Sequence, residues 1–139
     1  MGAYAENRKA RFNHEILSTL EAGIELKGFE VKAIKSGKCS IAGSYAVPKG
    51  ETLWLINADI PPYQPNNTPT DYDPKRSRRL LVKREEVREF IGKQKSAHLT
   101  LVPLRVYNKA GLVKIELGIA RPKKKHDKRE TIRKREVTK

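Results

Sequence analysis

The strongest constraint on the fold is an alternation of apolar and polar residues near the C-terminal end. Over residues 113–120 every second side chain is apolar, namely Val113, Ile115, Leu117 and Ile119. Residues 100–106 show a similar period of two. The four residues 108–111 between these segments end in a glycine and suit a hairpin loop that needs a positive φ. The pattern predicts an antiparallel hairpin with one face turned to a core.

The segment that begins at Asn13 predicts a helix. Asn is a favoured N-cap, and an apolar stripe at helical spacing runs from Ile16 to Leu20. Gly23 stands where a glycine commonly ends a helix. Glu21 then falls in the last turn, where the helix dipole disfavours an acid. Glu21 is either an exposed glutamate that costs little or an acceptor held for a specific hydrogen bond, and the residues alone favour the first.

Shorter segments predict the rest of the fold. Strands are expected at residues 24–26, 44–47, 52–58 and 79–83, and further helices at 29–35 and 84–92. Residues 60–74 hold five of the eight prolines and predict a long surface loop. Short strands with few long helices favour a mainly β, α+β fold: an antiparallel β-barrel of the oligonucleotide-binding type, with about three helices packed outside it. Another α+β arrangement is the alternative.

The chain carries a large excess of positive charge. Its 30 Lys and Arg against 16 Asp and Glu give a formal net charge of +14, which favours a polyanionic partner and nucleic acid first. Residues 121–139 alone hold ten basic and three acidic residues. We therefore expect a β-barrel domain over residues 1–120 and a separate basic tail over residues 121–139.

Composition also excludes several classes of protein. The single cysteine, Cys39, excludes an internal disulfide and a Cys-rich zinc site, and the three histidines lie far apart in sequence. Nucleophile and phosphate-loop motifs are absent, so neither catalysis, nor a metal, nor a cofactor is expected. No apolar run reaches the roughly 18 residues of a membrane span, and the first residues do not form a secretory signal. A cytoplasmic protein is the expectation.

Basic side chains gather in three places, at residues 8–11, at residues 75–79 and in the tail. Any one cluster could be an ordinary solvated face, but three in so short a chain favour RNA or DNA. Three aromatic residues, Tyr45, Trp54 and Tyr107, fall in predicted strands, where we interpret them as core or barrel-face packing. Recognition is then expected to depend on shape and backbone more than on base stacking.

A collinear series of short motifs runs along nearly the whole chain from Asn7 onward. The motifs are Asn7-Arg8-Lys9-Ala10-Arg11, Glu21-Ala22-Gly23-Ile24, Gly28-Phe29-Glu30-Val31-Lys32, Ser44-Tyr45-Ala46, Arg78-Arg79-Leu80-Leu81, Leu101-Val102-Pro103-Leu104, Val113-Lys114-Ile115-Glu116-Leu117 and Lys124-Lys125-His126-Asp127-Lys128-Arg129. In order and spacing they resemble the small protein B family, the SsrA-binding proteins. Each motif alone is weak, but their series is highly specific.

The resemblance implies a barrel of the oligonucleotide-binding type that binds the tRNA-like part of transfer-messenger RNA. It implies delivery of that RNA to stalled ribosomes for trans-translation, by a protein that is not an enzyme and forms a 1:1 complex as a monomer. The tail is expected to be disordered when free and helical in the decoding centre and mRNA channel, against 16S rRNA. The thirteen residues 127–139 of the tail are too few for a stable isolated helix.

The resemblance also assigns residues. It implies RNA-binding roles for Asn7, Arg8, Lys9 and Glu21, and a ribosomal role for His126, Asp127, Lys128 and Arg129. Further RNA-binding candidates are Arg11, Lys35, Arg78 and Arg79, and further decoding-centre candidates are Lys123, Lys124 and Lys125. For Glu21 it favours the hydrogen-bond acceptor. Pro122 replaces the usual glycine of the family, which predicts a stiffer junction between barrel and tail. The alternative is a structural ribosomal or ribosome-assembly protein that binds rRNA, against which only the motif series argues.

Overall fold

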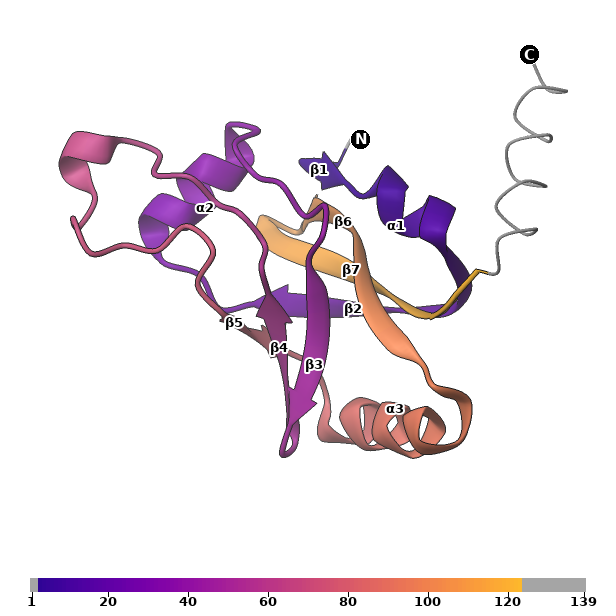
Figure 1. Cartoon of the computed structure of the whole chain (residues 1–139). Helices are drawn as coiled ribbons and strands as arrows, with labels where there is room; N and C mark the ends of the chain where they lie inside the picture. The colour runs from indigo at the N-terminus through magenta and orange to yellow at the C-terminus, as the bar shows by residue number, and fades with distance from the viewer. Residues whose placement is uncertain (1–2, 124–139) are drawn as a thin grey trace, which may run out of the picture.

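A computed structural model describes residues 3–123 (Figure 1). The strands are β1 (Ala5–Glu6), β2 (His14–Ile24), β3 (Tyr45–Lys49), β4 (Thr52–Ile56), β5 (Arg78–Leu81), β6 (Thr100–Lys109) and β7 (Leu112–Pro122). The helices are α1 (Arg8–Asn13), α2 (Gly28–Lys35) and α3 (Arg84–Ala97), with a short 3-10 helix η1 (Pro65–Asn67). The predictions made for residues 124–139 lie outside the described residues.

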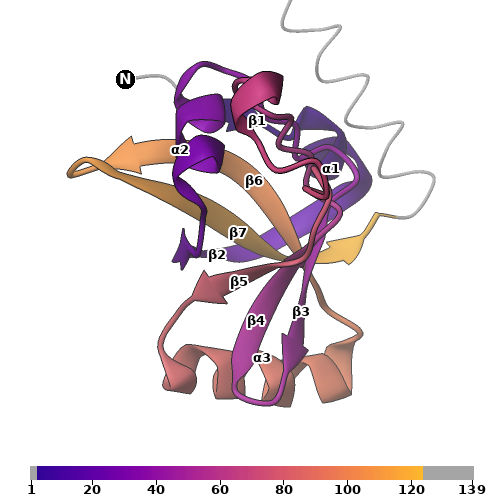
Figure 2. The same ribbon diagram turned by 90° about the vertical axis from the view of Figure 1, so that its left-hand side faces the viewer.

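Pairing between β6 and β7 closes the sheet into a barrel. The strand order is β1-β6-β3-β4-β5-β2-β7, and β6 pairs in addition with β7. Neighbouring strands are antiparallel throughout. A closed sheet leaves no long unpaired edge for another chain to join. In Figures 1 and 2, α3 lies across one end of the barrel, and α1 and α2 lie toward the other. The predicted α+β class and antiparallel barrel are confirmed.

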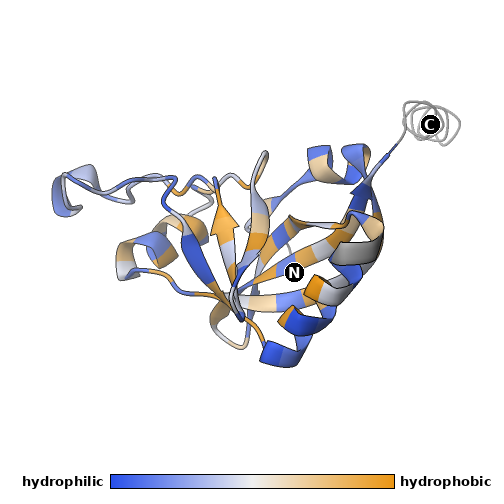
Figure 3. Ribbon diagram, turned by 60° about the horizontal axis from the view of Figure 1, so that its bottom comes forward, coloured by the Kyte–Doolittle hydropathy of each residue, from blue (hydrophilic) through white to orange (hydrophobic). Residues whose placement is uncertain are grey.

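The core is built from the inward residues of the strands together with the apolar face of α3. Ile115 and Leu117 of β7 and Leu80 of β5 are all almost fully buried, as the period of two requires. From α3, Val87 and Phe90 join the same cluster. The strands in Figure 3 alternate between hydrophobic and hydrophilic colours. The sequence pattern therefore separates an apolar interior from a polar outer surface.

The helix predicted over residues 13–23 is wrong, because this segment forms β2. The strand contains a β-bulge between Ile16 and Ser18, where the register against β7 shifts. Before the bulge Ile16 packs beneath α1, and after it Leu20 packs against the barrel core. Because of the bulge, Ile16 and Leu20 lie on opposite faces of β2. In the sequence their spacing of four residues looks like one turn of a helix. Since Glu21 lies in a strand, no helix dipole acts on it.

The other predicted elements form, with shifted boundaries. The hairpin, the helix over residues 29–35 and the proline-rich loop are confirmed as β6–β7, α2 and the segment around η1. Residues 24–26 do not make a strand of their own, because β2 ends at Ile24. Helix α3 continues beyond the predicted end at residue 92. Strand β7 continues past the predicted domain boundary at residue 120 and reaches Pro122, which pairs with His14.

Candidate RNA-binding surface

Asn7 is the N-cap of α1 and lies inside the protein. Its Oδ1 accepts a hydrogen bond from the backbone N–H of Ala10 at 3.0 Å. Its Nδ2 donates to the carbonyls of Ile41 at 3.1 Å and Pro103 at 2.9 Å. The residue is 3 % exposed. The amide holds α1 against β6 and the loop before β3, and an RNA contact by Asn7 stays a prediction.

The three basic residues of the same motif lie in α1 and are exposed: Arg8, Lys9 and Arg11. Between them, Ala10 is buried against β6 and β7, in a small apolar cluster that lies outside the barrel core. Ala10 marks the side of α1 that faces the protein, and the three basic side chains extend from the other sides of the helix into solvent. Arg11 Nη2 lies 3.5 Å from Glu116 Oε1 on β7, which connects α1 to the neighbouring sheet surface.

The outward side chains of β2, β7 and β6 form that neighbouring surface, here called the outer face: Glu21, Lys114, Glu116, Arg105, Tyr107 and Lys109. Glu21 is opposite Glu116, and Glu116 is opposite Arg105 on the next strand. Arg105 Nε lies 3.6 Å from Glu116 Oε1, and its guanidinium carbon lies 4.3 Å from the centre of the Tyr107 ring. The outer face is therefore a mixed surface with three cations, two acids and one tyrosine.

Glu21 is held by hydrogen bonds from β6. The Tyr107 hydroxyl donates to Oε2 of Glu21, and Lys109 Nζ donates to both carboxylate oxygens at 3.2 and 3.3 Å. The Tyr107 and then the Lys109 hydrogen bond lower the pKa of Glu21. Burial and the bond to the carboxylate raise the pKa of Tyr107 to about 12. Glu21 is thus an acceptor held in a specific hydrogen bond, although within a strand.

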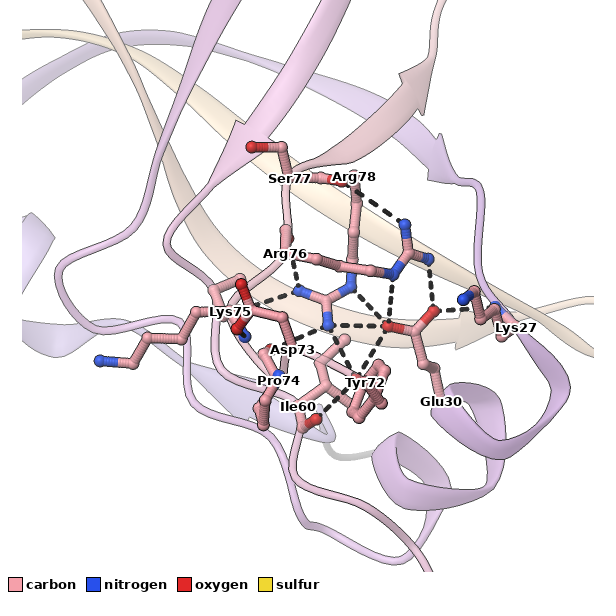
Figure 4. A network of polar contacts seen from close by, with 11 residues as sticks. Lys27, Glu30, Ile60, Tyr72, Asp73, Pro74, Lys75, Arg76, Ser77 and Arg78 are labelled. Atoms are coloured by element: carbon pink, nitrogen blue, oxygen red, sulfur yellow. Dashed lines mark hydrogen bonds and ion pairs between the residues drawn. The ribbon is translucent and has the colours of Figure 1, made fainter. Parts of the chain in front are cut away.

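Arg78 is completely buried and faces Glu30 of α2 (Figure 4). Its guanidinium donates to Glu30 Oε2 at 2.8 Å, to the carbonyls of Ala58, Pro74 and Arg76 at 2.9, 2.9 and 3.1 Å, and to the Tyr72 hydroxyl at 3.0 Å. These bonds use every donor that arginine has. The side chain of Arg78 therefore serves the fold, and its contact with RNA stays a prediction.

Glu30 is the centre of this network. Arg76 Nη2 lies 2.5 Å from Oε1, and the backbone N–H of Lys27 donates to the same oxygen at 2.8 Å. Burial alone would raise the pKa of Glu30, but the bonds from Arg76, Lys27 and Arg78 outweigh it and lower that pKa to about 2. The Tyr72 hydroxyl lies 3.0 Å from Glu30 Oε2 and 2.7 Å from the carbonyl oxygen of Ile60, and its one hydrogen is shared between these two acceptors. The network thereby joins the proline-rich loop to α2.

The other predicted residues are exposed but spread over the surface. Arg79 is the outward neighbour of Arg78 on β5 and pairs in register with Trp54 of β4. Lys35 is exposed in the last turn of α2, which lies apart from α1 in both views (Figures 1 and 2). Lys123 closes the described chain, and its N–H donates to the carbonyl of Asn13 at 2.9 Å. Neither Lys35 nor Arg79 belongs to the outer face.

Within residues 3–123, no group of three or more His, Cys, Asp or Glu side chains could hold a metal ion. Burial raises the pKa of the Cys39 thiol to about 11, so the thiol is protonated at neutral pH. No helix in this part of the chain is both long enough and apolar enough to cross a membrane.

The family model described as "SmpB protein" matches residues 4–139. The chain belongs to the SmpB protein family. The resemblance seen in the motif series is therefore confirmed. Members of the family that resemble it include SsrA-binding proteins of three organisms. The one from Synechococcus elongatus is 50 % identical over 132 residues, which cover 95 % of this chain and 86 % of that protein.

The two other SsrA-binding proteins have nearly the same sequence identity to this chain. The one from Chlorobaculum tepidum is 52 % identical over 132 residues, covering 94 % of this chain and 83 % of that protein. The one from Rhodopseudomonas palustris is 51 % identical over 133 residues, covering 95 % and 84 %. Among solved structures, a chain from "tmRNA-SmpB: a journey to the center of the bacterial ribosome" matches with a TM-score of 0.69 at 44 % identity, covering 92 % of this chain and 93 % of that chain.

Sequence reasoning missed part of the surface that this SmpB family member presents. Arg105, Tyr107 and Lys109 were not singled out as candidates, although they occupy alternate positions of a predicted strand. The period of two was the signal that could have found them, because it puts all three on the face opposite the core. Tyr45 is 43 % exposed, and Trp54 is only half-buried, so neither is a core residue.

Proposed function

We propose that the chain binds the tRNA-like domain of transfer-messenger RNA and delivers it to stalled ribosomes for trans-translation. The observation that carries this proposal is the 44 % identity, over nearly the full length of both chains, to the SmpB chain of a solved structure of tmRNA and the bacterial ribosome. The relatives named as SsrA-binding proteins support the same RNA as partner. The net charge of +14 fits a partner made of phosphates.

Within this role, α1 and the outer face form the main RNA contact. The exposed Arg8, Lys9 and Arg11 neutralise phosphates beside Arg105 and Lys109 of the outer face. Glu21 offers a carboxylate acceptor for a ribose 2′-hydroxyl or a base amino group, since its orientation is held by Tyr107. Arg79 and Lys35 add contacts away from this surface. Asn7 and Arg78 act as positioning residues for α1 and for the proline-rich loop.

The barrel and the basic tail have different roles. The barrel holds the RNA, and the tail with Lys123, Lys124, Lys125, His126, Asp127, Lys128 and Arg129 enters the decoding centre and mRNA channel, ordered there against 16S rRNA. β7 continues to Pro122 and the N–H of Lys123 still bonds to Asn13, so a truncation that keeps the last strand whole ends after Lys123. A chain that ends at Lys123 should keep its affinity for the tRNA-like domain and lose peptide tagging. Loss of RNA binding in this variant would contradict the division.

The protein acts in the cytoplasm as an RNA-binding protein and not as an enzyme. It works as a monomer that binds one RNA, with no cofactor. The acyl chemistry of tagging belongs to its partners. Sedimentation of the complex with a transcript of the tRNA-like domain tests the 1:1 stoichiometry directly.

The experiment that tests the proposed function is sequencing of RNA crosslinked to the protein in cells. Enrichment of one tRNA-like RNA that contains a reading frame is the expected result. Enrichment of rRNA alone, with one copy of the protein per ribosome, would instead show the structural ribosomal protein that the composition also fits. A ribosome-rescue factor is expected far below one copy per ribosome.

A further inference from the structure

A cleft of about 230 Å³ opens between α1 and the loop that leads into β3. Its floor is apolar, because Ala10 and Val102 there are buried. Its rim is polar and includes Lys9, Asn13, His14, Tyr45 and Thr100. The volume lies below that of sites for drug-sized ligands, roughly 300–1,000 Å³, and suits a single planar ring system.

Two rim residues give the cleft the chemistry of a base-binding site. Tyr45 is exposed at the rim and offers an aromatic surface on which a base can stack. His14 Nδ1 lies 3.0 Å from the carbonyl oxygen of Ala10. Because a carbonyl only accepts, Nδ1 carries the proton, and in the neutral ring Nε2 is then an acceptor. That acceptor suits an exocyclic amino group of adenine, cytosine or guanine.

The charges around the cleft favour RNA as the occupant. Lys9 stands on the rim, and Arg8 is exposed beside it on the same helix. The backbone N–H of Lys123 donates to the carbonyl of Asn13 on the rim, so a third basic residue lies beside the cleft. A phosphate backbone drawn to these cations passes the mouth of the cleft.

We propose that this cleft binds one unpaired base of an RNA strand. The base stacks on Tyr45, its exocyclic amino group donates to His14 Nε2, and the adjoining phosphate pairs with Lys9. The contact lies outside the outer face, although it shares Lys9 with the α1 contact proposed for the tRNA-like domain. It does not require that the strand belong to transfer-messenger RNA.

The test uses the full chain and three single-stranded octamers: octa-adenylate, octa-uridylate and an octamer of purine riboside, which lacks the 6-amino group. Affinity is measured by fluorescence anisotropy, and the ring signals of Tyr45 and His14 are followed by NMR. We expect both rings to shift with octa-adenylate. Octa-adenylate should bind about tenfold more tightly than octa-uridylate and severalfold more tightly than the purine riboside octamer. Equal affinities for all three would overturn the role of His14.

Variants separate stacking from general charge. Tyr45→Leu should weaken octa-adenylate binding about tenfold, whereas Tyr45→Phe, which keeps the ring, should bind as the unchanged protein does. Lys9→Gln should weaken binding more than Lys49→Gln, a matched loss of charge on an exposed lysine at the far end of β3. Unchanged affinity of Tyr45→Leu, in a variant that still binds the tRNA-like domain normally, contradicts the proposal. Loss of binding to the tRNA-like domain would instead contradict the proposed function, so the two failures are distinct.

Discussion

The hydroxyl of Tyr107 on β6 donates to the carboxylate of Glu21 on β2, across the strand β7 that lies between them. Glu21 is opposite Glu116 of β7 and Tyr107 is opposite Lys114, so the bond runs diagonally across β7. It joins the two outer strands of the outer face and determines where the Glu21 carboxylate points. The acid among the cations is therefore an organised part of this surface.

Replacing Tyr107 by Phe should raise the pKa of Glu21 toward the ordinary value of glutamate. The Tyr107 hydrogen bond is the largest cause of the lowered pKa, and its loss leaves Lys109 as the main remaining partner. Carbon-detected NMR titration of the Glu21 carboxyl measures the change. Lys109→Gln is the comparison and should raise the same pKa, since it removes a hydrogen bond and a nearby positive charge. A Tyr107→Phe variant with an unchanged Glu21 titration would show that the bond does not form in solution.

Arg78 and Arg79 are adjacent arginines and should behave in opposite ways. Arg78→Gln removes a buried partner of Glu30 and should lower the free energy of unfolding by about 3 kcal/mol. Arg79→Gln removes an exposed side chain. It should change the free energy of unfolding by less than about 0.5 kcal/mol and should weaken RNA binding. Urea unfolding and RNA titration of both variants give the two readouts. Equal stability of the two variants is incompatible with the buried network.

Acid should destabilise the protein through Glu30. Its pKa of about 2 in the folded state lies below its value of about 4.5 in the unfolded chain. The folded carboxylate is therefore favoured above pH 4.5, and its contribution is lost as the pH falls toward 2. The difference in unfolding free energy between the unchanged protein and Glu30→Gln should shrink by about 3 kcal/mol over this range. A difference that does not depend on pH would exclude this role.

The binding of RNA should weaken steeply with salt. With about four to six phosphates contacted, the logarithm of the affinity for the tRNA-like domain should fall with the logarithm of salt concentration at a slope of about −3 to −5. Filter binding at several salt concentrations measures the slope. A slope close to zero would contradict the electrostatic account of RNA binding by α1 and the outer face.

The predictable parts of the fold were those in which neighbouring residues repeat a simple period. Val113 and its alternating successors indicated the hairpin because nothing interrupts β7. The helix predicted in place of β2 arose from the bulge at Leu17, which breaks the period of two; only the partner strand reveals it. Local sequence contains no sign of a pairing that depends on residues about a hundred positions away.

The candidate site shows the same limit at the level of single side chains. Composition indicated RNA, and the motifs indicated the region, but neither could tell Arg78 from Arg79. Their difference depends on Glu30, which lies 48 positions earlier and faces only one of them. Asn7 was likewise assigned to RNA because a buried cap and an exposed contact look alike in sequence.

The central claim, that α1 is a principal contact for the tRNA-like domain, is tested most directly by one titration. A labelled transcript of that domain is titrated with the unchanged protein, with Arg8→Gln/Arg11→Gln, and with Arg84→Gln/Arg88→Gln. The last pair removes the same charge from exposed arginines of α3 that pair with Glu51. The account predicts at least a tenfold loss of affinity for the α1 variant and less than twofold for the α3 variant. Equal losses in the two variants, or no loss at α1, would contradict it.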